Sequence, residues 1–260
     1  MERKPEWLKV RYNQEAVNEV AEMMRDLKLT TVCKEANCPN LGECYRKHTA
    51  TFMILGSICT RNCRFCNVTH GKPLPPDPEE PENVAQAAKK LGLRHVVLTC
   101  STRDDLPDGG AEQFAKCVRA IREVCPGTTV ETLISDMKGN TDALDIVIAA
   151  HPEVLNHNVE TVKELQSAVR PQARYQRSLD VLRYCKQKDP TLLTKTGFMV
   201  GLGETEDQIS ALMDDILETG CDILTIGQYL QPSPQHYPLA RYATPEDFAR
   251  LLNQRDSEIS

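Results

Sequence analysis

The sequence lacks long apolar runs, an apolar leader and any excess of positive charge. No stretch approaches the roughly 18 apolar residues of a membrane span. The segment after Met1 resembles neither a signal peptide nor a Ser/Arg-rich transit peptide. The formal net charge of −6 and the pI of about 5.6 argue against general binding to nucleic acids or membranes. We therefore expect a cytoplasmic globular protein without a nucleic-acid or membrane partner.

Cysteine, by contrast, is abundant, with 11 residues in a chain of 260. Disulfide frameworks belong to small secreted domains, so a chain of this length without an export signal is expected to keep its thiols reduced. Two triplets stand out, with the spacings C-x4-C-x5-C (Cys33, Cys38, Cys44) and C-x3-C-x2-C (Cys59, Cys63, Cys66). The other cysteines are predicted to be small buried hydrophobic residues: Cys100, Cys117, Cys125, Cys185 and Cys221.

Both triplets favour iron–sulfur clusters over structural zinc. Structural zinc prefers four ligands in short Cys or His pairs, and neither triplet has a fourth ligand at such a spacing. Thiolates suit iron–sulfur clusters, in which each iron of a cubane needs one ligand. Three cysteines leave one iron without a cysteine ligand. That iron can bind a substrate, a cofactor or an unusual side chain, so each triplet predicts a chemical site.

Short apolar runs alternate with helical patterns along most of the chain. The expected strands are Thr51–Ile58, His95–Cys100, Thr129–Ser135, Val154–Asn158, Leu192–Val200 and Ile223–Gln228. The expected helices are Gln14–Leu29, Pro81–Leu91, Ala111–Val124, Thr141–Ala150, Val159–Ala168, Tyr175–Lys188 and Thr205–Thr219. This order predicts an α/β fold, a partial (β/α)6 TIM-type barrel built from parallel βαβ units. Since functional loops gather at the C-terminal ends of barrel strands, the second triplet is predicted to lie at the mouth.

A C-x3-C-x2-C motif at the end of the first strand of a partial barrel resembles the radical S-adenosylmethionine superfamily. The resemblance implies that Cys59, Cys63 and Cys66 hold a [4Fe–4S] cluster. In this superfamily the open iron chelates the amino and carboxylate groups of S-adenosylmethionine. An electron from the cluster then cleaves the C–S bond and gives a 5′-deoxyadenosyl radical, the cofactor supplying the reactivity and the protein the orientation.

Further motifs narrow the resemblance to the lipoyl synthase family, in order from about residue 31 to residue 248. They are the Cys33–Cys44 block, Ala50–Gly56, Arg103–Gly110, Asn156–Asn158, Lys195–Glu204 and Gly227–Ser233. The resemblance implies that Cys33, Cys38 and Cys44 hold an auxiliary [4Fe–4S] cluster that is consumed as the sulfur source. Sulfur would be inserted at C6 and C8 of an octanoyl group. The group is carried by lipoyl domains of 2-oxoacid dehydrogenase E2 subunits or by the glycine cleavage H protein, and a ferredoxin or flavodoxin would be the reductant.

Six other residues are candidate contacts for S-adenosylmethionine. Asn156 and Asn158 lie on the same face of one strand and are candidates to bind a ribose. The alternative is that they are a structural pair whose hydrogen bonds are satisfied within the protein. His157, on the other face, is expected to be structural. Lys195 is a candidate partner of the cofactor's carboxylate, or a solvated lysine. The Lys195–Glu204 motif adds Met199, and its glycine-rich end predicts close backbone contact at Gly201 and Glu204, with a plain strand-to-helix turn as the alternative.

The expected domains are an N-terminal extension with the auxiliary cluster (1–48), the barrel (49–248) and a short tail (249–260). The family resemblance also implies a C-terminal Arg-Ser-Ser-Tyr segment whose serine is the fourth auxiliary-cluster ligand. That motif is absent from this sequence, so completed lipoyl product is expected to be low or absent. Two alternatives stay open: a truncated, non-catalytic iron–sulfur protein, and another sulfur-inserting radical S-adenosylmethionine enzyme.

Overall fold

The computed structural model describes residues 4–8, 22, 24–27, 29–31 and 51–256. The first cysteine triplet and most of the helix predicted at its N-terminal side therefore lie outside the described residues. Described elements at this end are a short 3-10 helix, η1 (Glu6–Leu8), and strand β1 (Thr30–Thr31).

The strands form one seven-stranded sheet in which spatial order follows chain order from β1 to β7. β1 pairs antiparallel with β2, and every later pair is parallel. The parallel strands are β2 (Thr51–Ile54), β3 (His95–Cys100), β4 (Thr129–Leu133), β5 (Val154–Asn156), β6 (Leu193–Val200) and β7 (Ile223–Gln228). All six predicted strands are confirmed, because β-branched and large apolar residues fit a sheet covered by helices.

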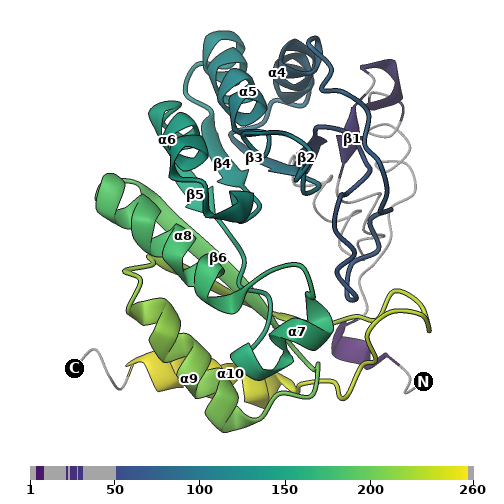
Figure 1. Cartoon of the computed structure of the whole chain (residues 1–260), viewed down its shortest axis with the longest axis vertical. Helices are drawn as coiled ribbons and strands as arrows, with labels where there is room; N and C mark the ends of the chain where they lie inside the picture. The colour runs from purple at the N-terminus through teal and green to yellow at the C-terminus, as the bar shows by residue number, and fades with distance from the viewer. Residues whose placement is uncertain (1–3, 9–21, 23, 28, 32–50, 257–260) are drawn as a thin grey trace.

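Helices follow most of the strands and surround the curved sheet on its outer side (Figure 1). They are α4 (Glu80–Lys90), α5 (Ala111–Val124), α6 (Thr141–Ala149), α7 (Gln166–Val169), α8 (Tyr175–Lys188), α9 (Glu206–Leu217) and α10 (Pro245–Asp256). Two further 3-10 helices are η2 (Met137–Gly139) and η3 (Lys163–Leu165). The partial α/β barrel predicted from the alternation is confirmed. Within the described residues, no helix is both long enough and apolar enough to cross a membrane.

The two faces of the sheet have different chemistry. The outer face packs against the helices, where Leu98, Phe114 and Ile121 are fully buried. The inner face is partly polar, because Glu131 and Lys195 lie on strand positions of opposite phase to the outward apolar residues. A polar inner face suits a barrel that encloses a small polar molecule and is otherwise costly to leave dry.

The helix predicted at Val159–Ala168 is wrong over its first four residues, and residues 163–168 are helical as predicted. Glu160 has a left-handed backbone (φ 73°) and bridges Phe198 in β6, so the chain continues in the strand direction beyond β5. Helical structure begins only at η3 and α7. The apolar spacing of Val159 and Val162 reflects burial against the helical layer, because both belong to one hydrophobic cluster.

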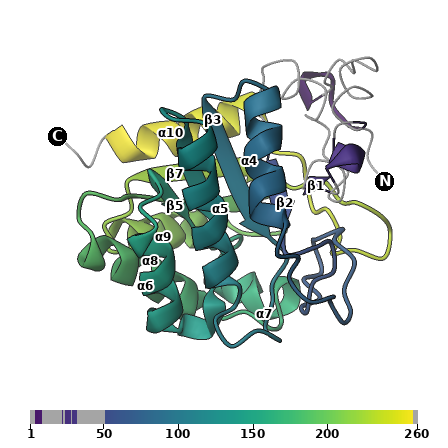
Figure 2. The same ribbon diagram turned by 90° about the horizontal axis from the view of Figure 1, so that it is seen from above.

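β2 ends four residues before the predicted boundary. Leu55 and Gly56 both have positive φ (66° and 81°), which ends the extended strand and starts the loop that carries the second triplet. Figure 2 shows this loop and α7 at one end of the sheet and α10 at the other. The C-terminal ends of the parallel strands therefore gather the cysteine loop and α7 at one edge.

Candidate active site

The loop after β2 places Cys59, Cys63 and Cys66 at the mouth of the barrel. The amide of Cys59 donates to Thr69 O (2.8 Å), and the amide of Gly71 donates to Cys59 O (2.9 Å), so the loop closes on itself. Thr60 Oγ1 donates to Thr102 O (2.9 Å), which ties the loop to the segment after β3. The placement at the C-terminal strand edge agrees with the sequence prediction.

Arg61 lies between Cys59 and Cys63 in the sequence and ties the loop to the segments that follow β3 and β4. Its guanidinium is almost fully buried and donates to both carboxylate oxygens of Asp104 (2.7 and 2.9 Å). It also donates to Asp136 Oδ1 (2.6 Å), and Asp136 is fully buried. Asp104 and Asp136 follow β3 and β4, so one side chain joins three successive strand ends. A bidentate, buried guanidinium holds its partners in one geometry.

Segments from the distant part of the chain complete the anchoring. The amide of Arg64 donates to Val169 O (2.9 Å), and the amide of Tyr237 donates to Arg64 O (2.7 Å). His236 Nε2 lies 3.2 Å from Cys66 O. The cysteine loop is thus held from the β3 side, from α7 and from the segment after β7.

Two thiols of the loop are buried enough that they stay protonated unless a cation compensates the charge of the thiolate. Burial raises the pKa of the Cys66 thiol to about 11 and also raises the pKa of Cys63. Buried thiols become thiolates when a metal compensates their charge. Among the described residues, no three His, Cys, Asp or Glu side chains converge on a single ion. A cubane cluster takes one thiolate per iron and does not require that convergence, so the donor set fits a cluster.

On the inner face of the sheet, Lys195 is paired within the protein. Its Nζ lies 3.0 and 3.1 Å from the carboxylate oxygens of Glu131. Asn156 Nδ2 donates to the same carboxylate (2.8 Å), and His95 Nε2 lies 3.5 Å from it. Burial alone would raise the pKa of Glu131, but these partners outweigh it and lower the pKa to about 2. The structure therefore brings Asn156 and Lys195 together around an ionised carboxylate.

Asn156 also has an open polar atom. Its Oδ1 is buried and has no hydrogen-bond partner among the described residues. Buried polar atoms are normally satisfied, so an orphaned oxygen inside the barrel fits a polar ligand there. Asn158 is only partly buried, and its Oδ1 is 3.1 Å from the position that a Cβ on Gly197 would take.

The remaining candidates lie on or after β6. Met199 occupies the inward phase of the strand, two positions beyond Gly197. Glu204 accepts hydrogen bonds from the amides of Gly201 (2.6 Å) and Leu202 (2.8 Å), so its carboxylate holds the strand-to-helix turn. A Cβ on Gly201 would lie 2.5 Å from Arg241 O, which accounts for the glycine by packing. Contact of these residues with a cofactor stays a prediction.

His157 is structural, as predicted. It is fully buried, with Nδ1 3.0 Å from Ile134 O and Nε2 2.9 Å from Ser178 Oγ. The cysteines outside the triplets also follow the prediction in part: Cys117, Cys185 and Cys221 are buried, whereas Cys100 and Cys125 are only partly so.

Sequence reasoning missed the charged residues around the loop. Arg61 and Asp136 are 75 positions apart, so no local spacing links them. Arg170 is buried and donates to Val159 O (2.9 Å), and its charge lowers the pKa of Cys63 against the larger effect of burial. Two signals were available: Arg61 lies inside the cysteine motif, and its partner Asp104 lies within the Arg103–Gly110 motif.

Comparisons with known proteins agree with this geometry. The family model described as "Radical SAM superfamily" matches residues 53–216. The chain is 56% identical over 248 residues to a lipoyl synthase from Caldanaerobacter subterraneus, covering 95% of this chain and 87% of that protein. It is 58% identical over 248 residues to a lipoyl synthase from Rubrobacter xylanophilus, covering 95% and 77%.

A solved structure shares the fold at low identity. The crystal structure of methylornithine synthase superimposes with a TM-score of 0.61 at 14% identity, covering 95% of this chain and 71% of that one. At this identity the likeness concerns the barrel architecture alone.

Proposed function

Because the chain belongs to the lipoyl synthase family of the radical S-adenosylmethionine superfamily, we propose that it inserts sulfur at C6 and C8 of a protein-bound octanoyl group. It is a sulfur-inserting radical S-adenosylmethionine enzyme that uses a [4Fe–4S] cluster and S-adenosylmethionine, and so a sulfurtransferase of lipoate biosynthesis. The observation that carries the proposal is the anchored C-x3-C-x2-C loop at the mouth of the barrel, in a chain that is 56% identical over 248 residues to a lipoyl synthase.

In this proposal Cys59, Cys63 and Cys66 hold the cluster that reduces S-adenosylmethionine. When bound, that cluster supplies the electron for reductive cleavage of the cofactor. The protein's own contribution is to fix the cysteine loop through Arg61 and to present polar atoms inside the barrel. The open Oδ1 of Asn156 is proposed to accept a hydrogen bond from the ribose of S-adenosylmethionine, and Asn158 is proposed to lie against the same group.

Four other residues on β6 and the turn after it are proposed to contact or position the cofactor: Lys195, Met199, Gly201 and Glu204. Lys195 already neutralises Glu131, so its proposed role is to orient Asn156 through that shared carboxylate. Gly201 and Glu204 shape the turn whose backbone would face the cofactor.

A second cluster is proposed for Cys33, Cys38 and Cys44, which lie outside the described residues. It would be the sulfur source, within an N-terminal extension of residues 1–48 next to a barrel of residues 49–248 and a tail of residues 249–260. The proposed substrates are octanoylated lipoyl domains of 2-oxoacid dehydrogenase E2 subunits and the octanoylated glycine cleavage H protein. A ferredoxin or flavodoxin is the proposed reductant, and the cytoplasm the proposed location.

Two triple variants test the division of labour between the triplets. Anaerobically reconstituted protein should hold about eight irons per chain, one cubane per triplet. Replacing Cys59, Cys63 and Cys66 with Ala should halve the iron and abolish formation of 5′-deoxyadenosine from S-adenosylmethionine and dithionite. Replacing Cys33, Cys38 and Cys44 should also halve the iron, but 5′-deoxyadenosine should persist while thiolation of an octanoylated lipoyl-domain peptide is lost.

Cys125→Ala is the matched control, since this cysteine lies at the end of α5, outside both triplets. It should leave iron content and both products unchanged. Equal behaviour of the two triple variants in the cleavage assay would contradict the assignment. Intact wild-type clusters without any thiolated product would favour the non-catalytic alternative.

A further inference from the structure

Arg170 is a buried arginine that lies next to the cysteine loop, at the end of α7. Only 8% of its surface is exposed. The amide of Arg64 in the loop donates to Val169 O (2.9 Å), so Arg170 directly follows the residue that is bonded to the loop. The amide of Arg170 donates to Gln166 O (2.8 Å), which fixes its main chain. The fold therefore brings a guanidinium to the segment that contains Cys63.

This guanidinium bonds to the main chain and keeps one donor open. Its Nη1 donates to Val159 O (2.9 Å) and lies 3.3 Å from Asn158 O. Its Nε is buried and has no hydrogen-bond partner within the part of the chain that the structure describes. Buried arginines are normally paired with an acidic group, and buried donors are normally satisfied. The charge and one donor of Arg170 are therefore available to an anionic group beside them.

The groups around Cys63 act on its thiol in opposite directions. Burial has the largest effect and raises the pKa of Cys63, whereas the charge of Arg170 and its hydrogen bond to the thiol lower that pKa. The carboxylate of Glu160 raises it, by less than the charge of Arg170 lowers it. Burial also raises the pKa of Glu160 itself, although Arg170 opposes this. Arg170 is thus the neighbour that most favours negative charge at Cys63.

We propose that Arg170 is a positioning residue that raises the reduction potential of the cluster held by Cys59, Cys63 and Cys66. The inference rests on the proposed function, because it takes that cluster as given. Reduction adds one electron and forms or breaks no bond, so the reduced state carries one more negative charge. A buried positive charge and a hydrogen bond to a ligand sulfur stabilise that state. Arg170 acts through Cys63 and does not need to touch the substrate.

A purely structural role for Arg170 would move the potential in the opposite direction. Its bonds to Asn158 O and Val159 O support the chain after β5, and losing them would loosen the site and admit water. A cluster with three thiolates is already anionic when oxidised, so water stabilises the reduced state more and raises the potential. Loss of the arginine charge lowers the potential. The sign of the shift therefore separates the two roles.

The test is an anaerobic redox titration of the reconstituted holoprotein without S-adenosylmethionine, read by EPR of the reduced cluster. The signal of the auxiliary cluster is recorded separately in the variant that lacks Cys59, Cys63 and Cys66. Arg170→Gln removes the charge but keeps an amide that can donate to Val159 O. At a fixed solution potential it should lower the ratio of reduced to oxidised cluster at least tenfold, or about 59 mV for a one-electron couple. Since the ratio is taken over loaded chains only, partial loss of iron leaves it unchanged.

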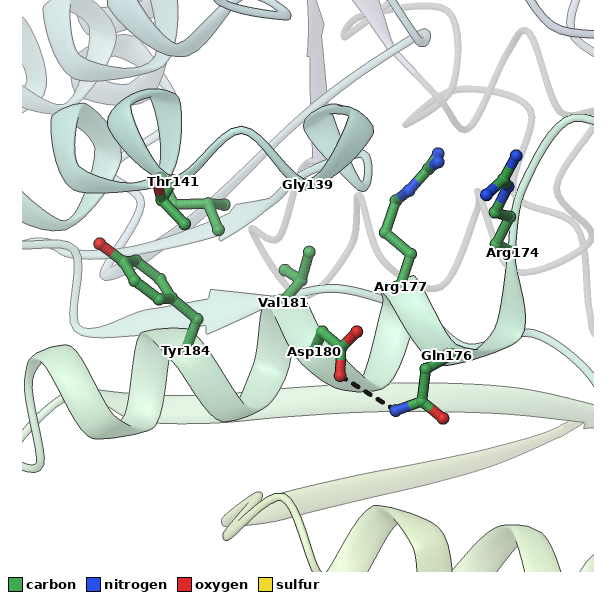
Figure 3. Close-up of a pocket in the computed structure, with 9 residues that line it drawn as sticks. Gly139, Thr141, Arg174, Gln176, Arg177, Asp180, Val181 and Tyr184 are labelled. Carbon is green, nitrogen blue, oxygen red and sulfur yellow. Dashed lines mark hydrogen bonds between the residues drawn. The ribbon is translucent and has the colours of Figure 1, made fainter.

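A second variant and a matched control isolate the charge. Arg170→Lys keeps the charge and should return the ratio to within about threefold of wild type. Arg174→Gln is the control, because Arg174 is exposed at the start of α8 and lines a pocket between α6 and α8. Figure 3 shows Arg174 and Arg177 extending in the same direction from that end of the helix. Water and salt screen an exposed charge, so the control ratio should stay within about twofold of wild type.

Four shifts of the potential would overturn this role of Arg170. They are no shift in Arg170→Gln, an upward shift, an equal shift in Arg174→Gln, and a shift that develops only after S-adenosylmethionine is added. The last would assign Arg170 to the cofactor. Loss of all iron from both Arg170 variants would also overturn it, since that shows a structural role.

Each of these results leaves the proposed function standing as long as the wild-type holoprotein forms 5′-deoxyadenosine. A wild-type chain that assembles no cluster on Cys59, Cys63 and Cys66 would overturn both proposals.

Discussion

Replacing Asp136 with asparagine should destabilise the protein and hold the cysteine loop less rigidly, because Asp136 pairs with Arg61 of that loop. Asp136 is fully buried, with Oδ1 2.6 Å from Arg61 Nη2 and Oδ2 3.4 Å from Arg177 Nη1. Burial alone would raise the pKa of Asp136, but the contacts with Arg61 outweigh it and lower the pKa from 3.8 to about 2. A depression of this size corresponds to about 2 kcal/mol of stability at neutral pH.

The full loss should be somewhat larger than that figure. Breaking a buried ion pair typically costs about 3–5 kcal/mol, because the remaining charge stays buried. Arg61 keeps its two bonds to Asp104, so we expect Asp136→Asn to lower the free energy of unfolding by about 2–4 kcal/mol. The cysteine-loop cluster should also be lost faster in air, since its loop is held less rigidly.

The assay is urea unfolding of the apoprotein followed by circular dichroism, with iron retention measured on the holoprotein. Asp180→Asn is the matched control, because that carboxylate is 58% exposed and pairs with Arg183 at the surface; a shift of at most about 0.5 kcal/mol is expected. Since the folded pKa of Asp136 is depressed, its stabilisation is present above pH 3.8 and is lost as the pH falls towards 2. Equal unfolding midpoints for the two variants at pH 7 would refute the reasoning.

Two further predictions concern His157 and Gly201. Burial lowers the pKa of His157 from 6.5 to about 4, so wild type should lose about 3 kcal/mol more stability than His157→Gln as the pH falls from 6.5 to 4. Parallel melting profiles of the two proteins across that range would contradict this. Gly201→Ala should cost about 2–4 kcal/mol, because φ is +101° and the new Cβ would lie 2.5 Å from Arg241 O. Gly227→Ala, with nothing within 4 Å, should melt within a few degrees of wild type, and similar losses in both variants would argue against the close approach.

The sequence predicted the barrel because its evidence is local. Strand β3 and helix α5 can each be predicted from the spacing of apolar residues within their own segments. The extended segment at Glu160 was missed for the opposite reason: its pairing with Phe198 is made across 38 positions of chain. Helix α10 had a usable signal, since Thr244 Oγ1 accepts from the amide of Asp247 (3.1 Å) in a Thr-Pro-Glu-Asp start.

For the candidate site, the cysteine spacing identified the proposed cluster ligands, but not the ion pairs that hold the cysteine loop in place. The C-x3-C-x2-C motif is readable because all three thiols lie on one short loop. The carboxylates that hold Arg61 lie 43 and 75 positions away, and the sequence contains many other acidic residues. The pairing of Lys195 with Glu131, 64 positions apart, was likewise not predictable from either residue.

The agreement of sheet order with chain order has a consequence for synthesis of the protein on the ribosome. Each parallel strand pairs with the one made just before it, so the sheet can grow one unit at a time with little loop-closure cost. The cysteine loop is made early, yet its contact between Cys66 and His236 spans 170 positions. We therefore expect this loop to take its final form only near the end of translation, which sets the earliest moment at which a stable cluster can be delivered.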